Sequence, residues 1–237
     1  LDLRKLTRGG LISRRAEAAQ ARELCGQLAV KMGGIGDPVS SLSGASDVLT
    51  ALGVKIDLTA DEIGAVVETA GVAFLWAPMH HPAMKVWAPV RAELGLRTLF
   101  NLMGPICNPA NVTRQVVGVF APEWVEPIAH VLHKLGSRHA WVVHGRDGLD
   151  ELSTTGPTLV AELKDGNVTT FEVTPEEAGL PRATMADLKG GDAAVNAAAL
   201  RQVLDGARGA YRDIVLLNTA AALVVGGRVQ PLAYGVG

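Results

Sequence analysis

Short apolar runs separated by longer stretches of mixed polarity set the pattern of this chain. The runs at residues 72–76, 115–120 and 139–144 have the length and composition of strands that a parallel sheet buries on both faces. The stretches around them are rich in helix-forming residues, at 13–30, 46–52, 59–70, 122–135, 192–205 and 212–225. This alternation predicts an α/β fold with a mostly parallel sheet flanked by helices.

Turn and cap residues sharpen the boundaries of these elements. Thr59 and Glu62 have the spacing of a capping box, which places the start of a helix at this point. Pro122 and Gly136 enclose another helix, with the usual proline near its start and glycine at its end. Residues 157–173 contain two apolar runs around an Asp-Gly-Asn turn, and this pattern predicts one β-hairpin late in the chain.

Composition and charge exclude several classes of protein. The 237 residues are 48% hydrophobic with a net charge of −2, and no basic cluster is interleaved with aromatics, so no nucleic-acid partner is expected. Cys25 and Cys107 stand alone, which favours a reducing compartment without a disulfide framework. The first residues lack the apolar stretch of a signal peptide, and the run at 214–225 is too short to span a bilayer. We therefore expect a cytoplasmic protein with no membrane partner.

Cationic side chains concentrate in the stretch from residue 78 to 109, which is punctuated by proline and glycine. It contains His81, Lys85, Arg91 and Arg97 among its polar residues. A guanidinium group binds a carboxylate or phosphate through two parallel hydrogen bonds, so the stretch is typical of a pocket for a small anion. The alternative is a solvated Arg/Glu surface with structural histidines.

An acidic pair follows the predicted strand at 139–144. Asp150 and Glu151 close the sequence G-R-D-G-L-D-E, and ligands in open α/β sheets bind beyond the carboxyl ends of strands. Adjacent carboxylates are the oxygen ligands that Mg²⁺ takes when it is shared with the phosphates of a substrate. A turn with solvated acids is the alternative, and His144 can be either a packed or a functional histidine.

A glycine- and serine-rich segment precedes the predicted helix at 46–52. Lys31, Gly33, Ser40 and Ser41 offer backbone, hydroxyl and ammonium donors of the kind that hold phosphate oxygens. A plain turn is the alternative. Two further segments of small residues, around Asn196 and Asn218, are best explained by close helix packing, and no chemistry is assigned to them.

Long motifs in these regions resemble the anthranilate phosphoribosyltransferase family. They are H-H-P-A-M-K, R-x-E-L-G-x-R-T-x-F-N-L-x-G-P-x-x-N-P, V-V-H-G-x-D-G-L-D-E and S-S-x-S-G-x-x-D-V-L, in the order of the family. The resemblance implies the phosphoribosyltransferase and nucleoside-phosphorylase type of catalytic domain. It also implies a glycosyltransferase that moves the phosphoribosyl group of phosphoribosyl pyrophosphate to anthranilate, giving N-phosphoribosylanthranilate and pyrophosphate in tryptophan biosynthesis.

The resemblance assigns roles to individual residues of this sequence. Arg91 matches the arginine that binds anthranilate, and His81 lies in the motif that lines the anthranilate path. Asp150 and Glu151 match the pair that binds Mg²⁺, the one cofactor implied. The adjacent serines of the glycine-rich segment match residues that hold phosphoribosyl pyrophosphate.

The sequence also departs from the family pattern. The G-T-G-G-D phosphate loop does not appear in its expected place, and residues 1–38 form an atypical segment before a C-terminally shortened catalytic domain at 39–237. Members of the family are usually homodimers, and the N-terminal helical domain that forms their interface has no match here. These departures predict weak transferase activity or none, as in an impaired fragment of the family. The sequence G-G-I-G-D at 33–37 is similar to a loop of pyrimidine-nucleoside phosphorylases, which is the second alternative.

Overall fold

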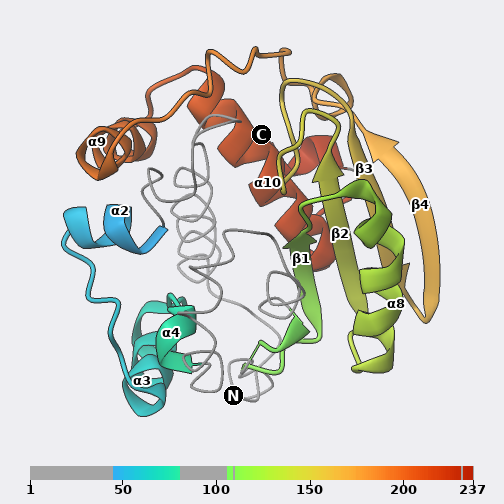
Figure 1. Ribbon diagram of the computed structural model, residues 1–237, viewed down its shortest axis with the longest axis horizontal. Helices are drawn as coiled ribbons and strands as arrows, with labels where there is room; N and C mark the ends of the chain where they lie inside the picture. Colours follow the sequence, from blue (N-terminus) through green and yellow to red (C-terminus); the bar gives the residue numbers. More distant parts are fainter. Residues whose placement is uncertain (1–44, 81–105, 109, 231, 237) are drawn as a thin grey trace, which may run out of the picture. The chain divides into compact units, whose positions relative to one another are not determined.

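The computed structural model describes the chain in four segments, residues 45–80, 106–108, 110–230 and 232–236 (Figure 1). The described residues between 53 and 112 belong to one compact unit, and those at 45–52 and 113–236 belong to a second. The helix predicted at 13–30 lies outside the described residues.

The first unit contains helix α3, Ala60–Ala70, whose start is fixed by a complete capping box. The hydroxyl of Thr59 accepts a hydrogen bond from the Glu62 N–H, and the Glu62 carboxylate accepts one from the Thr59 N–H at 2.8 Å. Gly71 ends the helix in the left-handed conformation, with φ of 79°. The predicted helix and its cap are therefore confirmed.

The strand predicted at 72–76 is wrong. These residues have no ladder partner within the described part of the chain, and the short helix α4, Ala77–His80, follows them directly. Only Ala73 in the segment is buried. An apolar run becomes a strand only where a neighbouring strand satisfies its backbone groups, and a single sequence does not show that neighbour.

The second unit is built on a sheet of four described strands in the order β1-β2-β3-β4. They are Arg114–Gly118, His139–Gly145, Thr158–Lys164 and Asn167–Val173. Strands β1 and β2 are parallel, whereas the pairings β2–β3 and β3–β4 are antiparallel. The α/β class and the late hairpin are confirmed, and the described part of the sheet is mixed where a mostly parallel one was predicted.

A crossover helix connects the two parallel strands. The 3-10 turn η3, Pro122–Trp124, leads into helix α8, Val125–Lys134, and Gly136 ends it with φ of 91°. The apolar side of α8 packs on β2 and β3 (Figure 1). Parallel neighbours run in the same direction, so the chain must return along the length of the sheet between them. A crossover helix does this, whereas a tight turn would make the second strand antiparallel.

The hairpin β3–β4 is closed by two residues with positive φ. Asp165 has φ of 50° and Gly166 has φ of 83°, which matches the twist of the flanking strands. Asn167 was predicted as part of the turn, but it is the first residue of β4 and pairs with Lys164.

Helices and 3-10 turns complete the second unit. They are α2 at Ala45–Ala51, η4 at Glu176–Ala178, α9 at Ala193–Leu204, α10 at Ala210–Val225 and η5 at Leu232–Gly235. Val48 of α2 is fully buried against Leu200 of α9 and Val215 of α10. None of the helices in the described part of the chain is long and apolar enough to cross a membrane.

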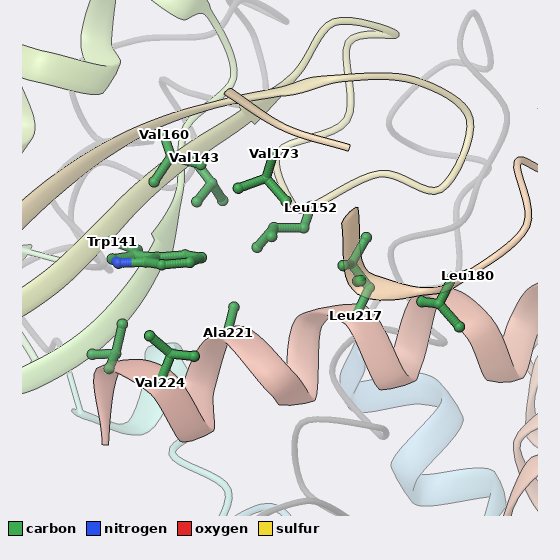
Figure 2. Close-up of a cluster of buried hydrophobic side chains, with 11 residues drawn as sticks. Trp141, Val143, Leu152, Val160, Val173, Leu180, Leu217, Ala221 and Val224 are labelled. Carbon is green, nitrogen blue, oxygen red and sulfur yellow. The ribbon is translucent and has the colours of Figure 1, made fainter. Parts of the chain in front are cut away.

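The main core of this unit lies between the sheet and α10. Figure 2 shows Trp141 and Val143 of β2 pointing toward Leu217 and Ala221 of the helix. Leu152, which follows β2 in a loop, joins the same cluster and is 0% exposed. The core therefore anchors a loop as well as the strands.

We predict that the carboxyl group of Glu62 titrates well below its usual range. The Thr59 N–H, the Thr59 hydroxyl and the Lys55 ammonium group lower the pKa of Glu62 from 4.5 to about 2. Because the pKa is depressed on folding, the carboxylate stabilises α3 above pH 4.5, and this contribution is lost as the pH falls toward 2. A ¹³C NMR titration of the Glu62 carboxyl carbon checks the midpoint.

Thr59→Ala is the matched variant for this titration. It removes the hydroxyl donor and keeps the backbone N–H, which is the larger cause, so the midpoint should rise only part of the way. A wild-type midpoint near 4.5 would contradict the capping box.

Candidate functional site

The acidic pair Asp150–Glu151 lies in the loop that follows the carboxyl end of β2. Asp150 is half-buried, and Glu151 is only 4% exposed. The alternative of a solvated acidic turn is therefore wrong for Glu151. Ionised carboxylates are rarely buried unless a cation or hydrogen-bond donors compensate the lost hydration, so this placement favours a functional role.

Asp147 ties this loop together from within. Its Oδ1 accepts a hydrogen bond from the Leu149 N–H at 3.0 Å, and its Oδ2 accepts from the hydroxyls of Ser153 and Thr155. One carboxylate thus joins residues that stand before and after the acidic pair. Because its oxygens are engaged inside the loop, Asp147 shapes the site and is not itself expected to hold a ligand.

Asn218 of α10 holds the same loop from the helix side. Its Oδ1 accepts a hydrogen bond from the Leu152 N–H at 2.9 Å, and its Nδ2 donates to the Leu152 carbonyl at 2.7 Å. The residue bonded in this way comes directly after Glu151. The side chain of Asn218 is buried, with an exposed fraction of 4%.

The end of β1 lies against the backbone of the acidic pair. A Cβ atom built on Gly118 would stand 1.6 Å from the carbonyl oxygen of Asp150. No side chain fits in that space. Glycine at this position is therefore required for the loop to pass so close to the strand.

His144 has a structural role at the same end of the sheet. Its ring is buried, and its Nδ1 lies 2.9 Å from the Val119 carbonyl oxygen. This contact connects the end of β2 to the residue just after β1. The structure therefore supports the packed alternative for this histidine.

The donor set fits a magnesium ion that is shared with a substrate. Among the described residues, no group of three or more His, Cys, Asp or Glu side chains could form a complete metal cage. Two adjacent carboxylates supply only oxygen, and Mg²⁺ typically takes one or two of them and completes its shell with water and phosphate oxygens. Asp150 and Glu151 meet that requirement.

The other predicted site residues lie outside the described residues. They are Lys31, Gly33, Ser40, Ser41, His81 and Arg91. Their roles stay predictions, and so does a pocket for an anion in the stretch 78–109.

Sequence reasoning missed the residues that fix the acidic pair. Asn218 was interpreted as part of a packing segment, although an amide within the apolar run 214–225 is a usable signal, because a buried amide must find partners. Asp147 belongs to the same motif as the pair and was given no role. Gly118 carried no signal, because the close approach of Asp150 depends on the fold.

A family model described as "Glycosyl transferase family, a/b domain" matches residues 17–237. The chain belongs to this family. The match begins inside the segment 1–38 that the sequence analysis set apart, so that boundary stays a prediction.

Curated relatives confirm the resemblance found in the sequence. The anthranilate phosphoribosyltransferases of Rhodopseudomonas palustris (strain BisB18) and Parvibaculum lavamentivorans are 63% and 62% identical to this chain over 198 residues. Each alignment covers 84% of the chain and 58% of the relative. The chain thus matches less than two thirds of the length of these relatives.

Solved structures agree on the fold of this glycosyl transferase domain. Anthranilate phosphoribosyltransferase from Thermus thermophilus is 41% identical with a TM-score of 0.79, over 91% of this chain and 66% of that one. The enzyme from Saccharomyces cerevisiae in complex with PRPP and Mg has a TM-score of 0.76 at 23% identity, over 93% and 62% of the two chains. At that identity the yeast structure supports the fold alone.

We predict that Gly118→Ala destabilises the protein and disturbs the acidic loop. The added methyl group would overlap the Asp150 carbonyl, so the strand or the loop must move, and overpacking of this kind costs about 1–3 kcal/mol. Thermal denaturation measures the loss of stability.

Gly156→Ala is the matched control for this substitution. Gly156 lies in the same loop, and a Cβ built on it meets no heavy atom within 4 Å. Because the added methyl group meets no atom, Gly156→Ala should lose less stability than Gly118→Ala. Equal melting temperatures for the two variants would show that the close contact between β1 and the loop does not limit the side chain at position 118.

Proposed function

We propose that this chain carries the catalytic α/β domain of an anthranilate phosphoribosyltransferase. The reaction transfers the phosphoribosyl group of phosphoribosyl pyrophosphate to the amino group of anthranilate and releases pyrophosphate. The acidic pair beyond the carboxyl end of β2, in which Glu151 is buried and Asp150 is half-buried, carries the proposal. The 63% identity to an enzyme of that name adds support.

The acidic pair would serve the departing pyrophosphate. Asp150 and Glu151 would hold Mg²⁺ through their carboxylate oxygens, in the way that Mg²⁺ is usually shared between protein and phosphate. Bound there, the ion would neutralise negative charge that develops on the leaving group. The role of the protein would be to keep the two carboxylates in one arrangement before the substrate binds, so that no reorganisation is needed during the reaction.

The remaining roles come from the sequence. Arg91 would orient anthranilate through its carboxylate, with His81 beside the path of that substrate. Lys31, Gly33 and the serines at 40–41 would donate hydrogen bonds to the phosphate oxygens of the donor. Orientation and electrostatic stabilisation then account for catalysis, and no side chain is assigned as a general acid or base.

The rate of this chain should be low. The G-T-G-G-D loop of the family is not found in its expected place in the sequence, and loss of one preorganised donor typically costs about 10²–10³-fold in kcat. We expect Mg²⁺-dependent transfer slower than about 1 s⁻¹, the lower edge of the usual enzyme range. Loss of anthranilate fluorescence in the presence of phosphoribosyl pyrophosphate measures it.

Asp150→Asn tests the acidic pair in the same assay. It should reduce the rate of transfer more than about tenfold. Removal of even a hydrogen-bond partner of a metal ligand typically lowers metal affinity or activity by about 10–100-fold. Asp165→Asn makes the same chemical change in the exposed hairpin turn, where asparagine suits a φ of 50°, and should leave the rate unchanged. Equal rates for both variants would remove the proposed role of Asp150.

Two other outcomes decide between the alternatives. Wild-type turnover within about 1–10³ s⁻¹ would show that the chain is not an impaired fragment. Phosphate-dependent cleavage of thymidine, without use of anthranilate, would show that the phosphorylase alternative is right.

A further inference from the structure

We propose that Asn218, together with Asp147, is a positioning residue that sets the direction of the Asp150 and Glu151 carboxylates. Neither residue would touch the substrate. The inference rests on the proposed function, because it concerns how the same acidic pair is held. It adds two residues to the site, one of them on a helix that lies 66 positions further along the chain from Leu152.

The amide of Asn218 makes a reciprocal pair of hydrogen bonds with one residue. Its oxygen accepts from the Leu152 N–H at 2.9 Å, and its nitrogen donates to the Leu152 carbonyl at 2.7 Å. The second amide hydrogen is donated to the Ile214 carbonyl at 3.0 Å, within α10 itself. The side chain is therefore fixed to the helix and to the loop at the same time.

This contact acts on the acidic pair through the backbone. The nitrogen of Leu152 belongs to the peptide group that begins at the Glu151 carbonyl, so holding that nitrogen limits the backbone rotation of Glu151. The Leu152 side chain cannot yield either, because it is 0% exposed and packs in the cluster that contains Leu217 (Figure 2). Backbone and side chain thus hold the position that follows Glu151.

Packing alone does not explain an amide at this position of α10. Ala220 and Ala221 lie two and three positions after Asn218 in the same helix. They are 0% exposed and carry no polar atom in their side chains. A buried amide is stabilising only when its partners are in place, and besides the Ile214 carbonyl those partners are the N–H and carbonyl groups of Leu152. The choice of asparagine therefore points to the loop.

Asp147 restrains the loop on the other side of the acidic pair. Its carboxylate accepts from the Leu149 N–H, just before Asp150, and from the hydroxyls of Ser153 and Thr155, just after Leu152. Residues 148–152 are consequently held at both ends. Partners of metal ligands commonly fix ligand direction in this way.

Asn196 supplies a matched control within the same protein. Its Oδ1 accepts from the Gly191 N–H at 2.8 Å, and its Nδ2 donates to the Gly191 carbonyl at 2.9 Å. It is buried to a similar degree, with 5% exposed. The two asparagines make the same contact, but that of Asn196 holds the start of α9 and not the acidic pair.

The test compares Asn218→Ala with Asn196→Ala in binding of a metal–pyrophosphate complex. Protein is titrated into Mn²⁺ and pyrophosphate, with water-proton relaxation as the readout and circular dichroism to confirm that each variant is folded. We expect the binding midpoint of Asn218→Ala to rise about 10–100-fold, as for other partners of metal ligands. For Asn196→Ala we expect a change below about twofold, since its contact holds the start of α9 and neither Asp150 nor Glu151.

Asp147→Ala extends the test to a half-buried turn, where no core packing is lost. It should weaken binding of the Mn²⁺–pyrophosphate complex by about tenfold or more. If Asn218→Ala does not fold, this variant provides the test of the inference. Wild-type midpoints in the folded variants, or equal losses in Asn218→Ala and Asn196→Ala, would overturn this inference and leave the proposed function intact. A wild-type chain that does not bind the complex would overturn the proposed function, and the inference with it.

Discussion

Strand β2 is buried along its whole length, and the loop with the acidic pair starts from its end. Trp141 and Val143 on one face pack in the cluster with α10, whereas Ala140 and Val142 alternate onto the face that α8 covers (Figure 1). A strand held between two layers has little freedom to shift, because interiors are close-packed. The loop therefore departs from a fixed point.

The loop then returns to the core within a few residues. Leu152 is anchored by its side chain among apolar neighbours and by its backbone on Asn218. Between these anchors Gly118 lets β1 approach the Asp150 carbonyl, and Asp147 closes the loop on itself. In the proposed function this loop keeps the two carboxylates preorganised, which is the condition under which fixed charges contribute most to catalysis.

Local signals in the sequence predicted much of this fold. The capping box of α3 and the hairpin turn that begins at Asp165 depend on residues a few positions apart, and both were found at the predicted place, although Asn167 belongs to β4. The prediction of a strand at 72–76 was wrong because strand pairing depends on residues that are distant in the sequence. The contact of Asn218 with Leu152 was missed for the same reason, since it joins residues 66 positions apart. The acidic pair could be proposed from the sequence alone because its two carboxylates are adjacent there.

The location of the metal tests the account most directly. Crystals of the chain soaked in Mn²⁺ and pyrophosphate would show the ion by its anomalous scattering. The account predicts a peak about 2 Å from carboxylate oxygens of Asp150 or Glu151, the usual distance for Mg²⁺ and its oxygen ligands. A fully occupied Mn²⁺–pyrophosphate site elsewhere, with neither carboxylate in contact with the ion, would contradict it.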